Sequence, residues 1–76
     1  MADSAKDIYD AAIQEFSEFL KNVPKDQSEH NIAKLKIASI IEKLPETMFP
    51  SLFLKFKFML GYHYGLTREQ VYKWKL

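Results

Sequence analysis

The sequence contains no cysteine, which excludes disulfide bonds and any metal site built on thiolates. It also has little glycine and proline, with two glycines and three prolines among 76 residues. The longest mostly apolar stretch, residues 48–60, is interrupted by Pro50, Lys55 and Lys57, and it is too short and too charged to span a bilayer. The first ten residues are polar and acidic, without the apolar segment of a secretory signal. We therefore expect a cytoplasmic protein (nuclear if the source is eukaryotic) that makes no contact with a membrane.

The residue patterns of an active site are also missing. The only histidines, His30 and His63, lie far apart in the sequence, and neither has a cluster of carboxylates beside it. No serine–histidine–acid arrangement and no glycine-rich phosphate loop is recognisable. We expect both histidines to lie on the surface, His30 at a helix start and His63 beside a turn. The expectation is a protein without enzyme activity, metal, cofactor or small-molecule substrate.

What is present is the composition of a folded domain, with 47% hydrophobic and 28% charged residues. A chain of 76 residues forms a single domain with a modest core, to which dimerisation would add stability. Its charge is unevenly distributed: residues 1–47 hold six lysines and nine acidic residues (net −3), whereas residues 48–76 hold five basic residues and one acidic residue (net +4). This excess near the C-terminus favours an anionic partner on one face.

Hydrophobic periodicity predicts four helices, at about residues 4–23, 29–44, 51–64 and 67–76. Asp3 or Ser4 is expected to cap the first helix, and Pro24 to end it. Its predicted buried stripe is Ile8, Ala12, Phe16, Phe19, Leu20 and Val23, with Tyr9 and Ile13 beside it.

The second helix is expected to be capped by Ser28 or Asn31. Its predicted buried stripe is Ile32, Leu35, Ala38 and Ile41, flanked by Ile37 and Leu44, and Ile40 falls outside this arc.

Ser51 is the expected cap of the third helix. Residues 54–58 alternate between apolar and charged, which is typical of a strand. A helix is preferred because Phe53, Phe56, Leu60 and Tyr64 fit helical spacing, and because a lone strand would have no partner. The predicted aromatic core is Phe16, Phe19, Phe49, Phe53, Phe56 and Trp74. The expected fold class is all-α, a small four-helix domain.

The last seventeen residues carry the most specific signals. Gly61 has no side chain, so another helix can approach closely there, and Gly65 can adopt the positive φ that ends a helix. Thr67 and Gln70 have the spacing of a capping box, and Val71 and Trp74 fall on one helical face. These signals predict that a short final helix crosses the one before it.

This segment resembles a helix-turn-helix, and the residues from 65 to 74 (GLT-x-x-QV-x-x-W) resemble the turn and early third helix of homeodomain-like proteins. In that family a small residue marks the helix crossing, a glycine makes the turn, and apolar residues fill the joint. The matching positions here are Gly61, Gly65, Leu66, Val71 and Trp74. The resemblance implies a C-terminal helix-turn-helix whose final helix enters the major groove of DNA.

A second motif lies at Met48, Phe49 and Pro50, which is similar to the Met-Phe-Pro motif of CUE domains. Those are three-helix bundles of about this size that bind ubiquitin through this motif and a leucine pair near the C-terminal end. This chain ends K-W-K-L and has no such pair.

Two functions follow from these patterns. The first is a small DNA-binding regulator, for instance of a phage, plasmid or bacterium, with duplex DNA as its partner. Arg68 would read a base edge, Tyr72 and Lys73 would extend the contact, and Thr67 and Glu69 would share the outward face. The residues expected to bind phosphates are Lys55, Lys57 and Lys75.

The alternative is a non-enzymatic protein-interaction module, either an adaptor, an inhibitor or a homodimeric assembly domain. It is based on a surplus of apolar residues beyond what one small core needs: Tyr9, Ile13, Ile40, Tyr62, Tyr72 and Leu76. Self-association is expected under both hypotheses, since helix-turn-helix proteins commonly bind DNA as dimers.

Overall fold

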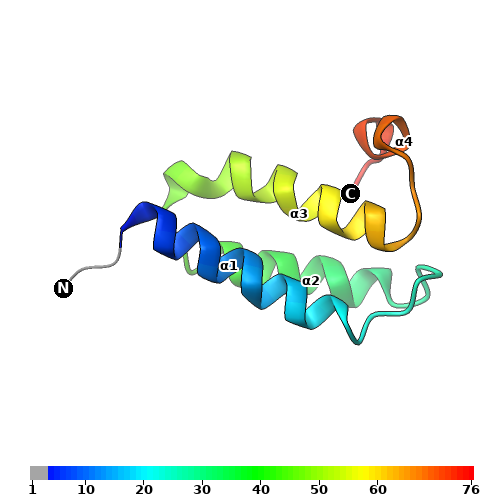
Figure 1. Ribbon diagram of the computed structural model, residues 1–76, viewed down its shortest axis with the longest axis horizontal. Coiled ribbons are helices and arrows are strands. Elements are labelled where there is room, and N and C mark those ends of the chain that lie inside the picture. Colours follow the sequence, from blue (N-terminus) through cyan, green and yellow to red (C-terminus); the bar gives the residue numbers. More distant parts are fainter. Residues whose placement is uncertain (1–3) are drawn as a thin grey trace.

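The computed structural model describes residues 4–76, and within them it contains four α-helices, one 3₁₀ turn and no strand. The predicted all-α class with four helices is therefore confirmed. Helices α1 (Ala5–Leu20), α2 (His30–Ile41) and α3 (Phe49–His63) pack against one another along their lengths, and α4 (Arg68–Lys73) lies across the C-terminal half of α3 (Figure 1). None of these helices combines the length and hydrophobicity that crossing a membrane requires.

Helix α1 follows its predicted pattern closely. The Ser4 hydroxyl accepts a hydrogen bond from the Asp7 backbone N–H at 3.2 Å, which satisfies an N–H that the helix itself leaves unpaired. The alternative cap, Asp3, lies outside the described residues. Ala12, Phe16 and Leu20 are buried. The helix ends at Leu20, before the predicted limit of 23, because the chain turns ahead of Pro24; Val23 is nevertheless buried.

Helix α2 is where the prediction of the buried face was wrong. Its buried residues are Ala33, Ile37 and Ile40, whereas Ile32 and Leu35 are 52% and 70% exposed. The helix is apolar around most of its circumference, so the sequence does not select a face, and packing against α1 and α3 decides the register. Of the six residues assigned to or beside the stripe, only Ile37 is fully buried; Ala38 is exposed and Ile41 and Leu44 are half-buried.

The predicted caps of α2 and α3 were also wrong. Glu29 occupies the N-cap of α2 and makes no side-chain capping bond, so neither Ser28 nor Asn31 has that role. Helix α3 begins at Phe49, directly after the 3₁₀ turn Glu46–Met48, because Pro50 is suited to the first turn of a helix. Ser51 is therefore already inside the helix, where its hydroxyl donates to the Met48 carbonyl at 3.3 Å.

The core lies between α1, α2 and α3 and centres on Phe16 and Phe56, whose ring centroids are 4.9 Å apart. Leu52 and Leu60 also lie on the buried face of α3. Because α3 spans Phe49–His63, residues 52–60 are a helix and not a strand, as predicted. The predicted aromatic core was only partly right. Phe16 and Phe56 are fully buried, Phe19, Phe49 and Trp74 are half-buried, and Phe53 is 41% exposed because it faces the open side between α2 and α3.

Candidate functional site: the face formed by α3 and α4

The turn between α3 and α4 is a Schellman motif. Gly65 has φ +83°, its N–H donates to the Tyr62 carbonyl at 3.0 Å, and the Leu66 N–H donates to the Gly61 carbonyl at 2.9 Å. A residue with a side chain is strained in this left-handed conformation, which is why glycine is suited to the position. The turn reverses the chain so that α4 comes back against α3.

The crossing itself depends on Gly61. A Cβ placed on this residue would lie 2.5 Å from a Val71 γ-methyl and 3.5 Å from the Trp74 indole. Val71 is fully buried at this contact. The glycine therefore allows a closer approach of the two helices than any other residue would permit.

Helix α4 begins with the predicted capping box. The Thr67 hydroxyl accepts from the Gln70 N–H at 3.2 Å, and the Gln70 side chain accepts from the Thr67 N–H at 2.8 Å. The helix is shorter than predicted and ends at Lys73, where Trp74 adopts an extended conformation. Residues 74–76 are thus not helical.

Trp74 packs in an aromatic cluster with the two residues that flank its ring. Its centroid lies 5.2 Å from that of His30 and 6.0 Å from that of Tyr64, and His30 Nδ1 and the Tyr64 hydroxyl share a hydrogen bond of 3.4 Å. Burial, followed by the charge of Lys34, holds the pKa of His30 below its ordinary value of 6.5. His30 is half-buried and packs between α2, the end of α3 and the C-terminal tail. The sequence had predicted an exposed residue.

His63 is also not the surface residue that we expected. Its Nε2–H donates to the Val23 carbonyl at 2.7 Å, and its side chain is half-buried. This bond fastens the end of α3 to the loop after α1. The sequence could not predict this hydrogen bond, because His63 and Val23 are forty residues apart.

A hollow of about 400 Å³ opens beside the α3–α4 crossing. Helix α3 contributes Lys55, Phe58 and Tyr62 to its wall, and α4 contributes Arg68 and Tyr72. Tyr9 of α1 also lines it. We call this surface the basic aromatic face.

Aromatic contacts organise the basic aromatic face. The ring of Phe58 meets that of Tyr72 edge to face, with ring centroids 5.1 Å apart, and the centroid of the Tyr62 ring lies 5.6 Å from that of Phe58. The Arg68 guanidinium lies 5.8 Å from the centroid of the Tyr72 ring, within cation–π range. These contacts link Arg68, Tyr72, Phe58 and Tyr62 in one series across α3 and α4.

The structure brings together three of the eight residues that the sequence assigned to DNA: Lys55, Arg68 and Tyr72. Lys57 is only two residues from Lys55, which places it about 200° around α3, and it does not line the hollow. Glu69 and Lys73 are exposed on the side of α4 away from the buried Val71. Thr67 is committed to the cap, and Lys75 is exposed in the tail.

Sequence reasoning did not assign Tyr9, Phe58 and Tyr62 to this face. A signal existed in part, because Leu54, Lys55, Phe58 and Tyr62 have the spacing of one side of a helix. Tyr9 gave no such signal, since its proximity to the hollow depends on how α1 packs against α3.

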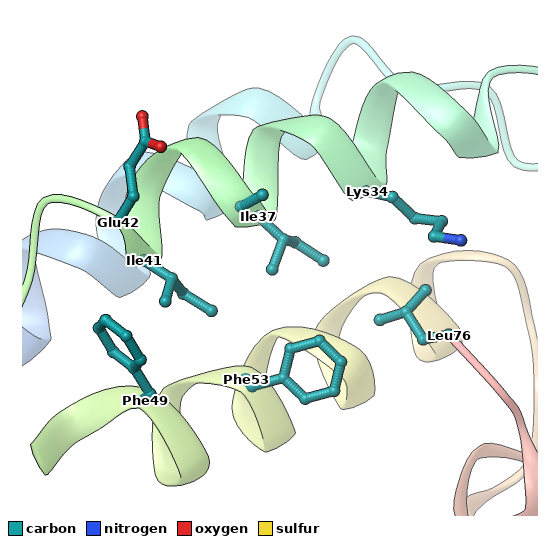
Figure 2. A pocket seen from close by; sticks show the side chains of 8 residues that line it. Lys34, Ile37, Ile41, Glu42, Phe49, Phe53 and Leu76 are labelled. Carbon is teal, nitrogen blue, oxygen red and sulfur yellow. The ribbon is translucent and has the colours of Figure 1, made fainter. Parts of the chain in front are cut away.

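A second hollow, of about 360 Å³, lies on the other side of α3, between α3 and α2. Figure 2 shows Ile37 and Ile41 of α2 and Phe49 and Phe53 of α3 pointing into it, with Lys34 and Glu42 at its two ends. Leu76 lies against the same space. We call this surface the α2–α3 groove.

No protein-family model matches the chain, and comparisons with curated proteins and with solved structures give no match either.

Proposed function

We propose that this protein binds duplex DNA through α4 and the basic aromatic face. The observation that supports the proposal is the gathering of Lys55, Arg68 and Tyr72, from two helices, around one hollow. Cations bind phosphate, and tyrosine supplies both a flat ring and a hydroxyl for sugar or base contacts. The α3–turn–α4 unit would then serve as a helix-turn-helix.

The dimensions of α4 are compatible with this use. A major groove about 12 Å wide admits one α-helix, whose diameter with side chains is about 10–12 Å, and the six residues of α4 span about 9 Å along the helix axis. The Gly61–Val71 contact fixes how far α4 stands out from α3, so the exposed side of α4 is held in one orientation.

Each exposed residue has a distinct proposed role. Arg68 is the candidate for a bidentate contact with guanine, and its position over Tyr72 pre-orients the guanidinium. Tyr72 and Lys73 extend the contact along the groove, while Lys55 and Lys75 bind phosphates. Lys57 lies on the other flank of α3 and has no role in this arrangement.

The test is a fluorescence anisotropy titration of a labelled duplex at several salt concentrations. The wild-type protein is expected to bind at low ionic strength and to weaken linearly on a log–log salt plot. Arg68→Ala and Lys55→Ala should each weaken binding, and Lys55→Ala should reduce the salt slope by about 0.9, the share of one phosphate contact.

Lys25→Ala is the matched control, because Lys25 is an exposed lysine in the loop between α1 and α2. It should leave both affinity and slope unchanged. Absence of binding at low salt, or equal affinity for wild type and the double variant Lys55→Ala/Arg68→Ala, would overturn the proposal. Preference for a single strand of the same length would overturn the duplex mode, because it would indicate stacking on the exposed rings.

The second candidate function, protein interaction, is favoured by the α2–α3 groove. Phe53 is 41% exposed there, and Leu35 is 70% exposed on the neighbouring side of α2. Apolar side chains left open in this way are typical of a surface that a protein partner covers.

A further inference from the structure

The exposed side of α2 has a sequence that is self-complementary about Ala38. Four residues before Ala38 is Lys34 and four after it is Glu42, while three before is Leu35 and three after is Ile41. In an isologous interface, residues at equal distances on either side of the two-fold axis face each other. An antiparallel pair of α2 helices crossing at Ala38 would therefore match cation with anion and leucine with isoleucine, twice over.

The described structure leaves these residues available. Ala38, Leu35, Lys34 and Glu42 are exposed, and Ile41 is half-buried at the edge of the α2–α3 groove. Neither Lys34 nor Glu42 makes an ion pair within residues 4–76. This contrasts with Lys36, one residue along from Leu35, which pairs with Glu15 of α1 at 3.0 Å.

We propose that a second copy of this chain covers the α2–α3 groove, through an antiparallel α2–α2 contact with Ala38 on the two-fold axis. The small side chain at the axis lets the two helices approach closely. Leu35 of each copy then enters the groove of the other beside Ile41, where Phe49 and Phe53 form the opposite wall (Figure 2). Lys34 of each copy faces Glu42 of the other and fixes the antiparallel direction.

This inference deepens the protein-interaction candidate and does not depend on DNA binding. The two are separable because the dimer is measured without DNA, and because Lys55 and Arg68 belong to the hollow on the other side of α3. If the protein does not dimerise, the DNA-binding result from anisotropy is unaffected. If it does not bind DNA, the dimerisation result is likewise unaffected.

The first measurement is the mass in solution by sedimentation equilibrium. We expect a species of twice the 8.9 kDa of one chain, with a Kd in the micromolar range. Leu35→Ser should return the protein to a monomer, whereas Leu54→Ser should not, since Leu54 is also an exposed leucine but lines the hollow of the basic aromatic face. A monomer at every concentration, or equal effects of the two substitutions, would overturn the proposal.

Charge reversal gives the sharper test of the arrangement. Lys34→Glu and Glu42→Lys each place two like-charged pairs in the contact, so each variant alone should dimerise roughly tenfold more weakly or worse. An equimolar mixture of the two variants places opposite charges together at both positions, and it should form a heterodimer. Failure of the mixture to associate more tightly than either variant alone would exclude the antiparallel register.

Because the chain has no cysteine, an Ala38→Cys variant carries a single thiol. With oxidised glutathione added as the oxidant, which is reduced to two thiols, two such residues on the axis should form a disulfide-linked dimer, while a Leu54→Cys variant should not. Equal crosslinking of both variants would contradict a two-fold axis at this residue.

Discussion

His30 shows at the scale of a single residue how a tertiary contact changes the behaviour of a side chain. Its ring lies between Tyr64 and Trp74, which come from the end of α3 and from the tail. Burial disfavours the charged imidazolium, and nearby Lys34 disfavours it further, so the pKa of His30 falls below 6.5. Burial likewise raises the pKa of Tyr64 above 10.0, with help from the charges of Asp26 and Glu29.

The sign of the resulting pH dependence follows from linkage. The unfolded chain binds a proton at His30 near pH 6.5, whereas the folded chain binds it only at lower pH. The His30 contribution to the free energy of unfolding is therefore fully present above pH 6.5 and is lost as the pH falls from there through the lowered folded pKa. Urea unfolding should show the wild type losing stability between pH 7.5 and 5.5 more than His30→Gln does.

Urea unfolding as a function of pH also distinguishes His30 from Asp26, because the two groups titrate in different pH ranges. Hydrogen bonds from the side chain and backbone of Ser28 lower the pKa of Asp26 below 3.8, so its contribution is lost only in stronger acid. Identical pH profiles for the wild type and His30→Gln between pH 7.5 and 5.5 would show that the His30–Tyr64–Trp74 cluster does not persist in solution.

At the scale of the element, the crossing of α3 and α4 depends on one contact between Gly61 and Val71. Gly61→Ala should lower the free energy of unfolding by roughly 1–3 kcal/mol, because the added methyl group overlaps the stiff, β-branched Val71. Val71→Ala alone should cost roughly 2 kcal/mol through lost packing. In the double variant the clash is relieved, so its cost should be less than the sum, with a coupling of about 0.5–3 kcal/mol.

The three variants form a double-mutant cycle for Gly61 and Val71, and Gly65→Ala is its control. Its Cβ would meet nothing within 4 Å, and the φ of +83° makes the substitution costly for the backbone alone, by about 1–2 kcal/mol. Combined with Val71→Ala it should be additive. If the changes in the free energy of unfolding for Gly61→Ala and Val71→Ala also add, then α3 and α4 do not meet closely at Gly61.

The elements also show what the sequence can and cannot specify. The buried stripe of α1 was predictable because Ala12, Phe16 and Leu20 lie on one side of the helix and polar residues lie on the opposite side. Only one face of α1 can therefore be buried. Helix α2 has aliphatic residues on several sides, so Ile37 and Leu35 are equivalent in the sequence, and only contact with α1 and α3 buries one and exposes the other. The Gly65 turn and the Thr67–Gln70 capping box were predictable because both are local interactions.

The candidate site was predictable only to the extent that it is local. Arg68 and Tyr72 are four apart on one short helix, and the sequence placed them together. The sequence assigned both Lys55 and Lys57 to phosphates, but they lie about 200° apart around α3 and only Lys55 lines the hollow. The inclusion of Tyr9 depends on packing between α1 and α3, for which no short-range pattern exists.

At the scale of the whole molecule, α3 separates two surfaces of different chemistry. Figure 1 shows α4 and α2 on different sides of α3. Helix α3 forms the basic aromatic face together with α4 and Tyr9 of α1. It forms the apolar groove together with α2 (Figure 2). Pairing two copies through α2 would leave both basic aromatic faces uncovered. Such a dimer would present two DNA-binding surfaces related by a two-fold axis, an arrangement that pairs naturally with two half-sites.

We propose that DNA binds on the α3–α4 side of the molecule. An ¹⁵N-labelled sample titrated with duplex DNA at low salt tests it most directly, by the positions of the backbone amides whose resonances shift. Shifts concentrated at Lys55, Phe58 and Tyr62 and along Arg68–Lys73 are the predicted result. Shifts centred on α2, or none at all, would show that DNA does not bind on the α3–α4 side.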